Sequence, residues 1–248
     1  MKKILLSLAI ALLTALPAQA ADLTVSAAAS LTDAFNAVKA EFTKTHPGVN
    51  VTMNFAASGA LLSQMEKGAP VDVFASADQK TMDMAVEKKL IDAPTRVNFA
   101  QNSLTLTVPA GNPAKVKDLA SLKTAAVKRV AIGNPDSVPV GRYTKAALTK
   151  MGEWDALASK FVMAESVRQV LDYLARGEVD AGFVYGTDAK QGGDKVKVVA
   201  EIPLEKPVSY PIAVLSASAD KKDAAAFVAF VVSPQGQAIL AKYGFKKP

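Results

Sequence analysis

Short β-rich runs alternate with stretches of helical periodicity from about residue 23 to the end of the chain. The clearest helical stripe recurs at steps of four, three and four residues and consists of Leu31, Phe35, Val38 and Phe42. Strands separated by helical patterns of about 10 to 15 residues are typical of α/β proteins, in which helices pack on sheets that are largely parallel. We therefore predict an α/β fold with mixed, mostly parallel sheets and helices on both faces.

The individual elements follow from the same patterns. Predicted strands, which are apolar runs rich in β-branched residues, cover 23–28, 49–55, 71–75, 104–108, 129–133, 179–185, 196–202 and 210–215. Predicted helices cover 31–42, 58–67, 79–90, 142–150, 167–174 and a last segment that begins at Ser233-Pro234. Two stretches that contain proline, 109–113 and 203–211, are interpreted as crossings between two lobes.

Residues 1–20 have the three-part pattern of a secretory signal peptide. Lys2 and Lys3 are followed by an apolar run from Ile4 to Leu16, and Ala18-Gln19-Ala20 is typical of a cleavage site. Cleavage after Ala20 removes two lysines and lowers the formal charge from +6 to +4. Since no cysteine is present to carry a lipid anchor, we expect a periplasmic protein with no stable membrane insertion after cleavage.

The residue types and motifs that the chain lacks exclude several classes of function. The 248 residues include no cysteine and one histidine, which excludes disulfides, thiolate metal sites, a cysteine nucleophile and a site with several histidines. The chain lacks a P-loop, a GxGxxG fingerprint and a G-x-S-x-G elbow, and its charges are dispersed. We therefore predict no enzyme and no nucleic-acid partner. A secreted serine-dependent hydrolase, which would need His46 beside Ser30 or Ser58, is the alternative from a different class.

Small or flexible residues join a strand to a helix at several points. These junctions are Ala27–Ser30, Phe55–Ser58, Val138–Gly141 and Ala164–Val167. Helix N-termini present backbone N–H donors, and ligands of open α/β sheets lie at the carboxyl ends of strands, so the junctions are candidate anion sites. Ser30, with Asp33 three residues later, and Ser58 are also explained as simple N-caps. Tyr185 is also explained as an ordinary half-buried tyrosine at a strand end.

The chain resembles the periplasmic molybdate-binding proteins of ABC transporters over essentially its whole mature length. The segments that carry the resemblance are TVSAAASLTDAF (24–35), NFAASGALLSQMEKGAPVDVFASAD (54–78), NSLTLTVP (102–109), AIGNPDSVPVGRYTKAAL (131–148), AESVRQVL (164–171) and GFVYGTDA (182–189). The resemblance implies two α/β lobes of the type II solute-binding fold with the ligand in the cleft between them. It implies one lobe at 21–102 and 210–248 and the other at 103–209.

The resemblance also implies a set of ligand-binding residues for molybdate and tungstate. These residues are Ser30, Ser58, Val140, Val167 and Tyr185. Both serines and Tyr185 would supply hydroxyl donors, and the serines and valines backbone N–H donors. Molybdenum would be bound only as the oxyanion, without a cofactor. The implied partners are an inner-membrane ABC permease and its ATPase, and the implied state is a monomer.

The chemistry of a tetrahedral dianion agrees with such a site. Its oxygens only accept hydrogen bonds, and a bond to a charged group contributes roughly 1.5 to 3 kcal/mol. Molybdate and tungstate are larger than sulfate, so cavity size would select among them, and partly protonated phosphate would lack an acceptor for its proton. Another tetrahedral oxyanion such as sulfate is therefore the alternative ligand. Arg142 and Arg168 follow two of the backbone donors, and direct contact of either with the anion is an alternative. Because long charged side chains in the first turn of a helix usually reach solvent, we expect that of both.

Overall fold

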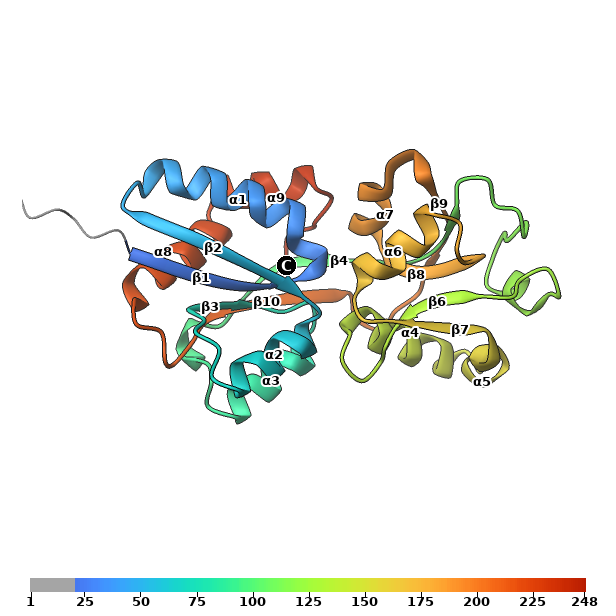
Figure 1. Ribbon diagram of the computed structural model, residues 1–248, viewed down its shortest axis with the longest axis horizontal. Helices are drawn as coiled ribbons and strands as arrows, with labels where there is room; N and C mark the ends of the chain where they lie inside the picture. The colour runs from blue at the N-terminus through green and yellow to red at the C-terminus, as the bar shows by residue number, and fades with distance from the viewer. Residues whose placement is uncertain (1–20) are drawn as a thin grey trace, which may run out of the picture.

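The computed structural model describes residues 21–248, so the predicted signal sequence at 1–20 lies outside the described residues. Two five-stranded sheets lie side by side (Figure 1). The first has the order β2-β1-β3-β10-β4 and consists of β1 (Ala21–Ala28), β2 (Val49–Ala56), β3 (Val73–Ala75), β4 (Val97–Asn102) and β10 (Val208–Val214). The second has the order β7-β6-β8-β5-β9 and consists of β5 (Leu104–Pro109), β6 (Val130–Gly133), β7 (Phe161–Ala164), β8 (Ala181–Tyr185) and β9 (Val196–Ile202).

Helices cover both faces of each sheet (Figure 1). On the first sheet, one face carries α1 (Thr32–Thr45), α8 (Lys221–Val232) and α9 (Pro234–Lys242), and the other carries α2 (Ser58–Glu66) and α3 (Gln79–Glu87). On the second sheet, one face carries α6 (Val167–Ala175) and α7 (Gly186–Gly192), and the other carries α4 (Pro139–Lys150) and α5 (Trp154–Leu157). Short 3-10 turns are η1 (Ala29–Leu31), η2 (Ala93–Thr95), η3 (Ala120–Lys123), η4 (Ala158–Lys160) and η5 (Gly193–Lys195). We call each sheet with its helices the first lobe and the second lobe.

Both sheets are mixed, as predicted. In the first, β1 pairs in parallel with β2 and β3, whereas β10 runs antiparallel to β3 and β4. In the second, β6 pairs in parallel with β7 and β8, whereas β5 runs antiparallel to β8 and β9. Antiparallel pairs make up a larger share of the strand pairs than expected. The reason is that a strand that leaves a lobe and a strand that returns to it must run in opposite directions.

The chain passes between the lobes at two extended segments. β4 ends at Asn102 and β5 begins at Leu104, so Ser103 alone joins the two sheets, and the return path connects Ile202 of β9 with Val208 of β10. The crossing expected at 109–113 is wrong, because β5 stays paired with β9 in the second sheet as far as Pro109. The lobe limits at 102/103 and 209/210 stay predictions.

The predicted stripe of α1 forms the centre of the first lobe's core. Phe35, Val38 and Phe42 are fully buried there. The Phe35 ring lies 5.6 Å from that of Phe99 on β4 and 6.2 Å from that of Phe227 on α8, measured between ring centroids. Burial of each such ring stabilises the fold by roughly 1.5 to 3 kcal/mol, so the stripe fixes α1 against the sheet.

One pair of helices meets part of the requirement for a membrane span. Among residues 21–248 no single helix is long and apolar enough to cross a membrane, but α8 and α9, which meet at a bend of 60°, pass that test jointly. Phe227 and Val231 of α8 are fully buried in the core of the first lobe.

Candidate functional site

The five predicted ligand-binding residues line one small cavity between the lobes. Its walls consist of Ala28, Ala29, Ser30, Ala57, Ser58 and Ala77 from the first lobe and Val138, Pro139, Val140, Val167 and Tyr185 from the second. The cavity has a volume of about 10 Å³ and no charged side chain in its lining. Its small size suits a compact ligand, and its neutral walls require that recognition depend on hydrogen bonds.

Ser30 lies just after the central strand of the first sheet. β1 ends at Ala28, whose backbone is extended (φ −53°, ψ 141°), and Ser30 is the middle residue of the 3-10 turn η1 that leads into α1. Its predicted role as an N-cap is wrong, because the chain begins to turn at Ala29, before Ser30 is reached. The Ser30 hydroxyl instead forms a hydrogen bond with the Tyr210 hydroxyl at 3.1 Å.

Ser58 occupies the equivalent place after β2. It is the first residue of α2, and the N-cap is Ala57, which has no side-chain oxygen to satisfy the helix start. The prediction that Ser58 is the cap is therefore wrong as well. The backbone N–H of Ala77 donates to the Ser58 oxygen at 3.0 Å, so the loop between β3 and α3 holds this fully buried side chain in place.

The second lobe contributes the starts of α4 and α6. α4 begins three residues earlier than predicted, at Pro139, and Val140 lies in its first turn. Gly141 allows α4 to begin this close to β6, because a Cβ atom there would stand 1.9 Å from the carbonyl oxygen of Gly133. Val167 is the first residue of α6, and Ser166 caps that helix by accepting from the N–H of Gln169 at 3.2 Å.

Three helix starts at the cavity lack a side-chain cap, whereas α6 is capped by Ser166. η1, α2 and α4 have no side-chain cap, whereas α3, α8 and α9 are capped by Asp78, Asp220 and Ser233 respectively. The first N–H groups of a helix have no acceptor within it, and the helix dipole adds partial positive charge at the same end. The uncapped starts therefore direct donors and positive potential to one place without a cationic side chain.

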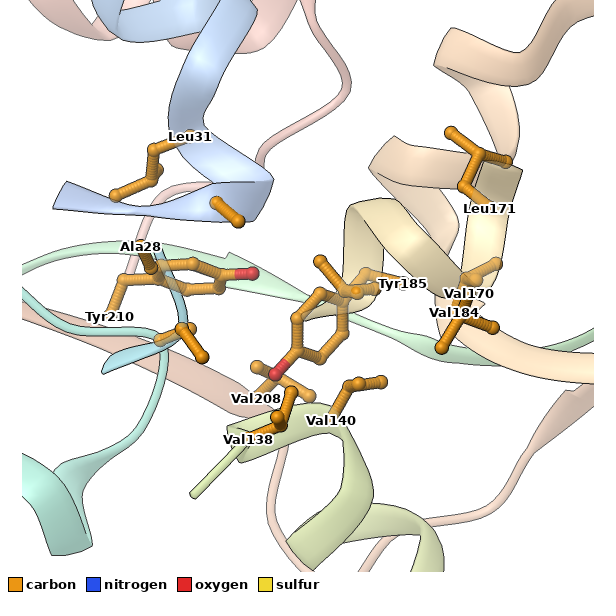
Figure 2. Close-up of a cluster of buried hydrophobic side chains, with 14 of the residues drawn as sticks. Ala28, Leu31, Val138, Val140, Val170, Leu171, Val184, Tyr185, Val208 and Tyr210 are labelled. Carbon is orange, nitrogen blue, oxygen red and sulfur yellow. The ribbon is translucent and has the colours of Figure 1, made fainter. Parts of the chain in front are cut away.

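Tyr185 ends β8 and is fully rather than half buried, with 1% of its surface exposed. Figure 2 shows its hydroxyl pointing toward Val138 and Val140, and this hydroxyl has no hydrogen-bond partner within residues 21–248. Burial, reinforced by the neighbouring Tyr210, raises the pKa of Tyr185 well above its usual value near 10, so the group keeps its proton. A buried hydroxyl without a partner costs roughly 1 to 3 kcal/mol, which marks it as a donor available to a ligand.

Contacts across the cleft hold the lobes together around this cavity. The Gly59 N–H donates to the Ser137 carbonyl at 3.0 Å. The Arg142 guanidinium reaches Asp78 at 2.7 Å and Thr81 at 2.6 Å in the opposite lobe. The expectation that Arg142 reaches solvent is therefore wrong, because the closed lobes offer its side chain two buried oxygen partners.

Arg168 forms a second bridge on the other side of the cavity. Its guanidinium lies 2.7 Å from Asp33 of α1 and 2.9 Å from Asp188 of α7, so it joins the two lobes. Its side chain stays partly exposed, as expected, but its guanidinium is held by these two carboxylates. Neither arginine lines the cavity.

Asp188 should make stability depend on pH. Burial raises the pKa of this fully buried carboxyl from its ordinary value near 3.8 to about 7, although Arg168 opposes the shift. Between about pH 4 and pH 7 the folded protein then binds more protons than the unfolded chain, so the unfolding free energy should fall as pH rises. The slope should approach roughly 1.4 kcal/mol per pH unit. Chemical unfolding at several pH values measures it, and Asp188→Asn should flatten it; an unchanged slope in that variant would contradict the assignment.

The only histidine of the chain lies far from Ser30. His46 follows the last turn of α1 and stacks on Phe42 at 4.0 Å between ring centroids. Ser30 lies at the opposite end of that 14-residue helix, about 20 Å away at the helical rise. The hydrolase alternative therefore lacks its base beside Ser30. Among the described residues no group of His, Cys, Asp or Glu is placed to hold a metal ion.

Sequence reasoning missed two polar residues next to the cavity. Tyr210 of β10 contacts Ser30, and Asn102, at the end of β4, donates to Tyr210 at 3.2 Å. Tyr210 was visible only as the start of a predicted strand, and Asn102 only as the first residue of the segment 102–109. Long-range pairing of β4 with β10 brings them together, and no local pattern encodes that pairing.

Comparison with known proteins gives consistent matches over most of the chain. The family model described as bacterial extracellular solute-binding protein matches residues 23–246. The molybdate-binding protein ModA of Escherichia coli K12 is 42% identical over 229 residues, which cover 90% of this chain and 88% of that protein.

Solved structures agree with these sequence matches. The substrate-binding domain of a putative molybdenum ABC transporter from Clostridium difficile is 38% identical, with a TM-score of 0.70, and the match covers 92% of this chain and 99% of that one. The periplasmic molybdate-binding protein of Azotobacter vinelandii is 26% identical, with a TM-score of 0.80, and the match covers 91% and 99% respectively.

Proposed function

The chain belongs to the bacterial extracellular solute-binding protein family, and we propose that it binds molybdate in the periplasm and delivers it to an ABC importer. The observation that carries the proposal is the neutral cavity, in which uncapped helix starts from both lobes meet the hydroxyls of Ser30, Ser58 and Tyr185. Relatives of this chain are solute-binding proteins, which supports a binding function rather than an enzymatic one.

The hydrogen-bond pattern favours an anion that carries no proton. Ser58 already accepts from the Ala77 N–H, which leaves its own hydroxyl proton for a ligand. Tyr185 keeps its proton and has no other partner in the part of the chain that the structure describes. The backbone N–H groups of Val140 and Val167 in the first turns of α4 and α6 can only donate. A cavity that offers donors and no acceptor disfavours hydrogen phosphate, because the proton of that anion would stay unpaired.

Anion binding between the lobes provides the coupling to transport. Donors from the first lobe and donors from the second must contact the same ligand, so the anion stabilises the closed arrangement of the two sheets. The contacts of Arg142 with Asp78 and of Arg168 with Asp33 form only in that arrangement. In this proposal the protein acts as a monomer without a cofactor, is exported by a cleaved signal peptide, and is recognised by an inner-membrane permease with its ATPase.

Calorimetry of refolded, anion-free protein tests the function. Molybdate, tungstate, sulfate and phosphate are titrated at matched ionic strength. We expect molybdate and tungstate to bind most tightly, since similar proteins are molybdate-binding proteins, and phosphate to bind least, because its proton would lack an acceptor. Tighter binding of sulfate would overturn the specificity, and the absence of any oxyanion binding would reject the proposed function.

A further inference from the structure

A buried set of hydrogen bonds connects the cavity with the crossing between the lobes. It begins at Ser30, passes through the hydroxyl of Tyr210 on β10, and reaches Asn102 at the end of β4. Asn102 also contacts Thr187 of α7 in the second lobe. All these residues are buried, with at most 6% of their surface exposed. Only Ser30 among them lines the cavity of the proposed anion site.

The side-chain amide of Asn102 fixes which groups donate and which accept in these hydrogen bonds. Its Oδ1 atom accepts from the backbone N–H of Ser103 at 3.0 Å and of Thr187 at 3.4 Å. Because only the oxygen of the amide can accept hydrogen bonds, these two backbone donors distinguish the Oδ1 atom from the Nδ2 group. The Nδ2 group therefore donates, to Thr187 Oγ1 at 2.8 Å and to the Tyr210 hydroxyl at 3.2 Å.

Tyr210 must then direct its own proton toward Ser30. Its oxygen accepts from Asn102, which has no acceptor to offer in return on that side. Burial, reinforced by the nearby Asp188 carboxyl, raises the pKa of Tyr210 well above 10, so the hydroxyl keeps its proton. Among its hydrogen bonds in the described residues, the Ser30 oxygen at 3.1 Å is the acceptor that remains. Ser30 is thereby left with its own proton free, on the side of the cavity.

We propose that Tyr210, oriented by Asn102, is a positioning residue that makes the Ser30 hydroxyl a donor to the bound anion. The inference rests on the proposed function and deepens it, because it assigns the selection against protonated anions to residues outside the cavity. Ser58 also accepts a hydrogen bond and so keeps its own proton for the anion. Its donor, however, is the backbone N–H of Ala77, which no side-chain substitution removes. Ser30 is therefore the hydroxyl whose direction a substitution can change.

A double-mutant cycle with two anions tests this role. Affinities for molybdate and for hydrogen arsenate, a tetrahedral anion that carries a proton at neutral pH, are measured for the wild type, Tyr210→Phe, Ser30→Ala and the double variant. Tyr210→Phe should weaken molybdate binding by about 3- to 10-fold, the range of one hydrogen bond. It should weaken arsenate binding less, because a freed Ser30 hydroxyl can turn to accept the arsenate proton. In the Ser30→Ala background it should have no further effect.

Asn102→Asp is a second variant, and it should reverse the direction of the hydrogen bond between residue 102 and Tyr210. It replaces the amide donor with a carboxylate oxygen, so Tyr210 would turn its proton toward residue 102 and accept from Ser30. The loss of molybdate affinity should then exceed that of Tyr210→Phe, and part of it should disappear in the Ser30→Ala background. Tyr173→Phe on α6 is the matched control, since this tyrosine lies outside the cavity lining, and it should leave both affinities unchanged.

The outcomes separate this inference from the function on which it rests. A wild-type protein that binds no molybdate would reject the proposed function. A wild type that binds molybdate, together with equal losses for Tyr210→Phe with and without the Ser30 hydroxyl, would overturn the positioning role. An unchanged ratio of molybdate to arsenate affinity in Tyr210→Phe and Asn102→Asp would also overturn it.

Discussion

Tyr185→Phe is expected to weaken molybdate binding by roughly 10- to 100-fold. The variant removes a donor to a charged ligand, and such a bond contributes roughly 1.5 to 3 kcal/mol. In the closed arrangement this hydroxyl is buried and has no partner among the described residues, so it is available to the anion. Phenylalanine keeps the aromatic ring and its packing, so the unfolding free energy of the anion-free protein should change little.

Calorimetry with molybdate measures the loss of affinity, and thermal unfolding without anion checks that the stability is retained. Tyr173→Phe removes a hydroxyl of the same kind from α6, outside the cavity lining, and should change neither quantity. The assignment of Tyr185 to the site fails if the variant binds molybdate like the wild type. A stability decrease would instead show that the hydroxyl has a partner within the protein.

Gly59→Ala is expected to weaken molybdate binding by roughly 10- to 100-fold without destabilising α2. In the closed arrangement a Cβ atom at residue 59 would stand 2.4 Å from the Ser137 carbonyl oxygen and 2.9 Å from its Cα atom. Both are backbone atoms of the opposite lobe, and overpacking of this kind costs about 1 to 3 kcal/mol. The open arrangement avoids the clash, and alanine favours the helix by up to about 1 kcal/mol.

Calorimetry and small-angle scattering with and without molybdate test this obstruction. The variant should keep a more extended shape than the wild type at the same molybdate concentration. Gly48→Ala is the control, because no atom lies within 4 Å of a Cβ placed at that exposed glycine. Wild-type affinity together with wild-type compaction in Gly59→Ala would show that the contact with Ser137 is not part of closure.

Patterns that repeat within one element predicted the fold well. The steps of four and three residues in Phe35, Val38 and Phe42 located the buried face of α1, because that face repeats with the helix itself. Elements without such a repeat were missed. β4 has the sequence VNFAQN, whose polar residues interrupt the alternation, and it is recognisable as a strand only through its pairing with β10.

The residues that line the candidate site could be predicted from the sequence, whereas the contacts that those residues make could not. The resemblance placed Ser30, Ser58 and Tyr185 together, and the structure brings them to one cavity. The capping roles of the serines were wrong, because sequence shows a serine before a helix and does not show at which residue the backbone begins to turn. The partners of Arg142 and Arg168 were also hidden, since they lie in the opposite lobe and depend on closure.

The two sheets use one strand order twice, and this repetition suits the shape of a tetrahedron. In the first lobe β1 and β2 lead into η1 and α2; in the second, β6 and β7 lead into α4 and α6. These four turns supply the backbone N–H donors proposed for the anion, and the third strand of each lobe adds Ala77 or Tyr185 to the lining. A tetrahedron has two-fold symmetry axes, along which its four vertices separate into two pairs that face opposite directions. A pair of turns on each side matches that symmetry, whereas a planar anion such as nitrate would leave one side without a full pair of oxygens to contact.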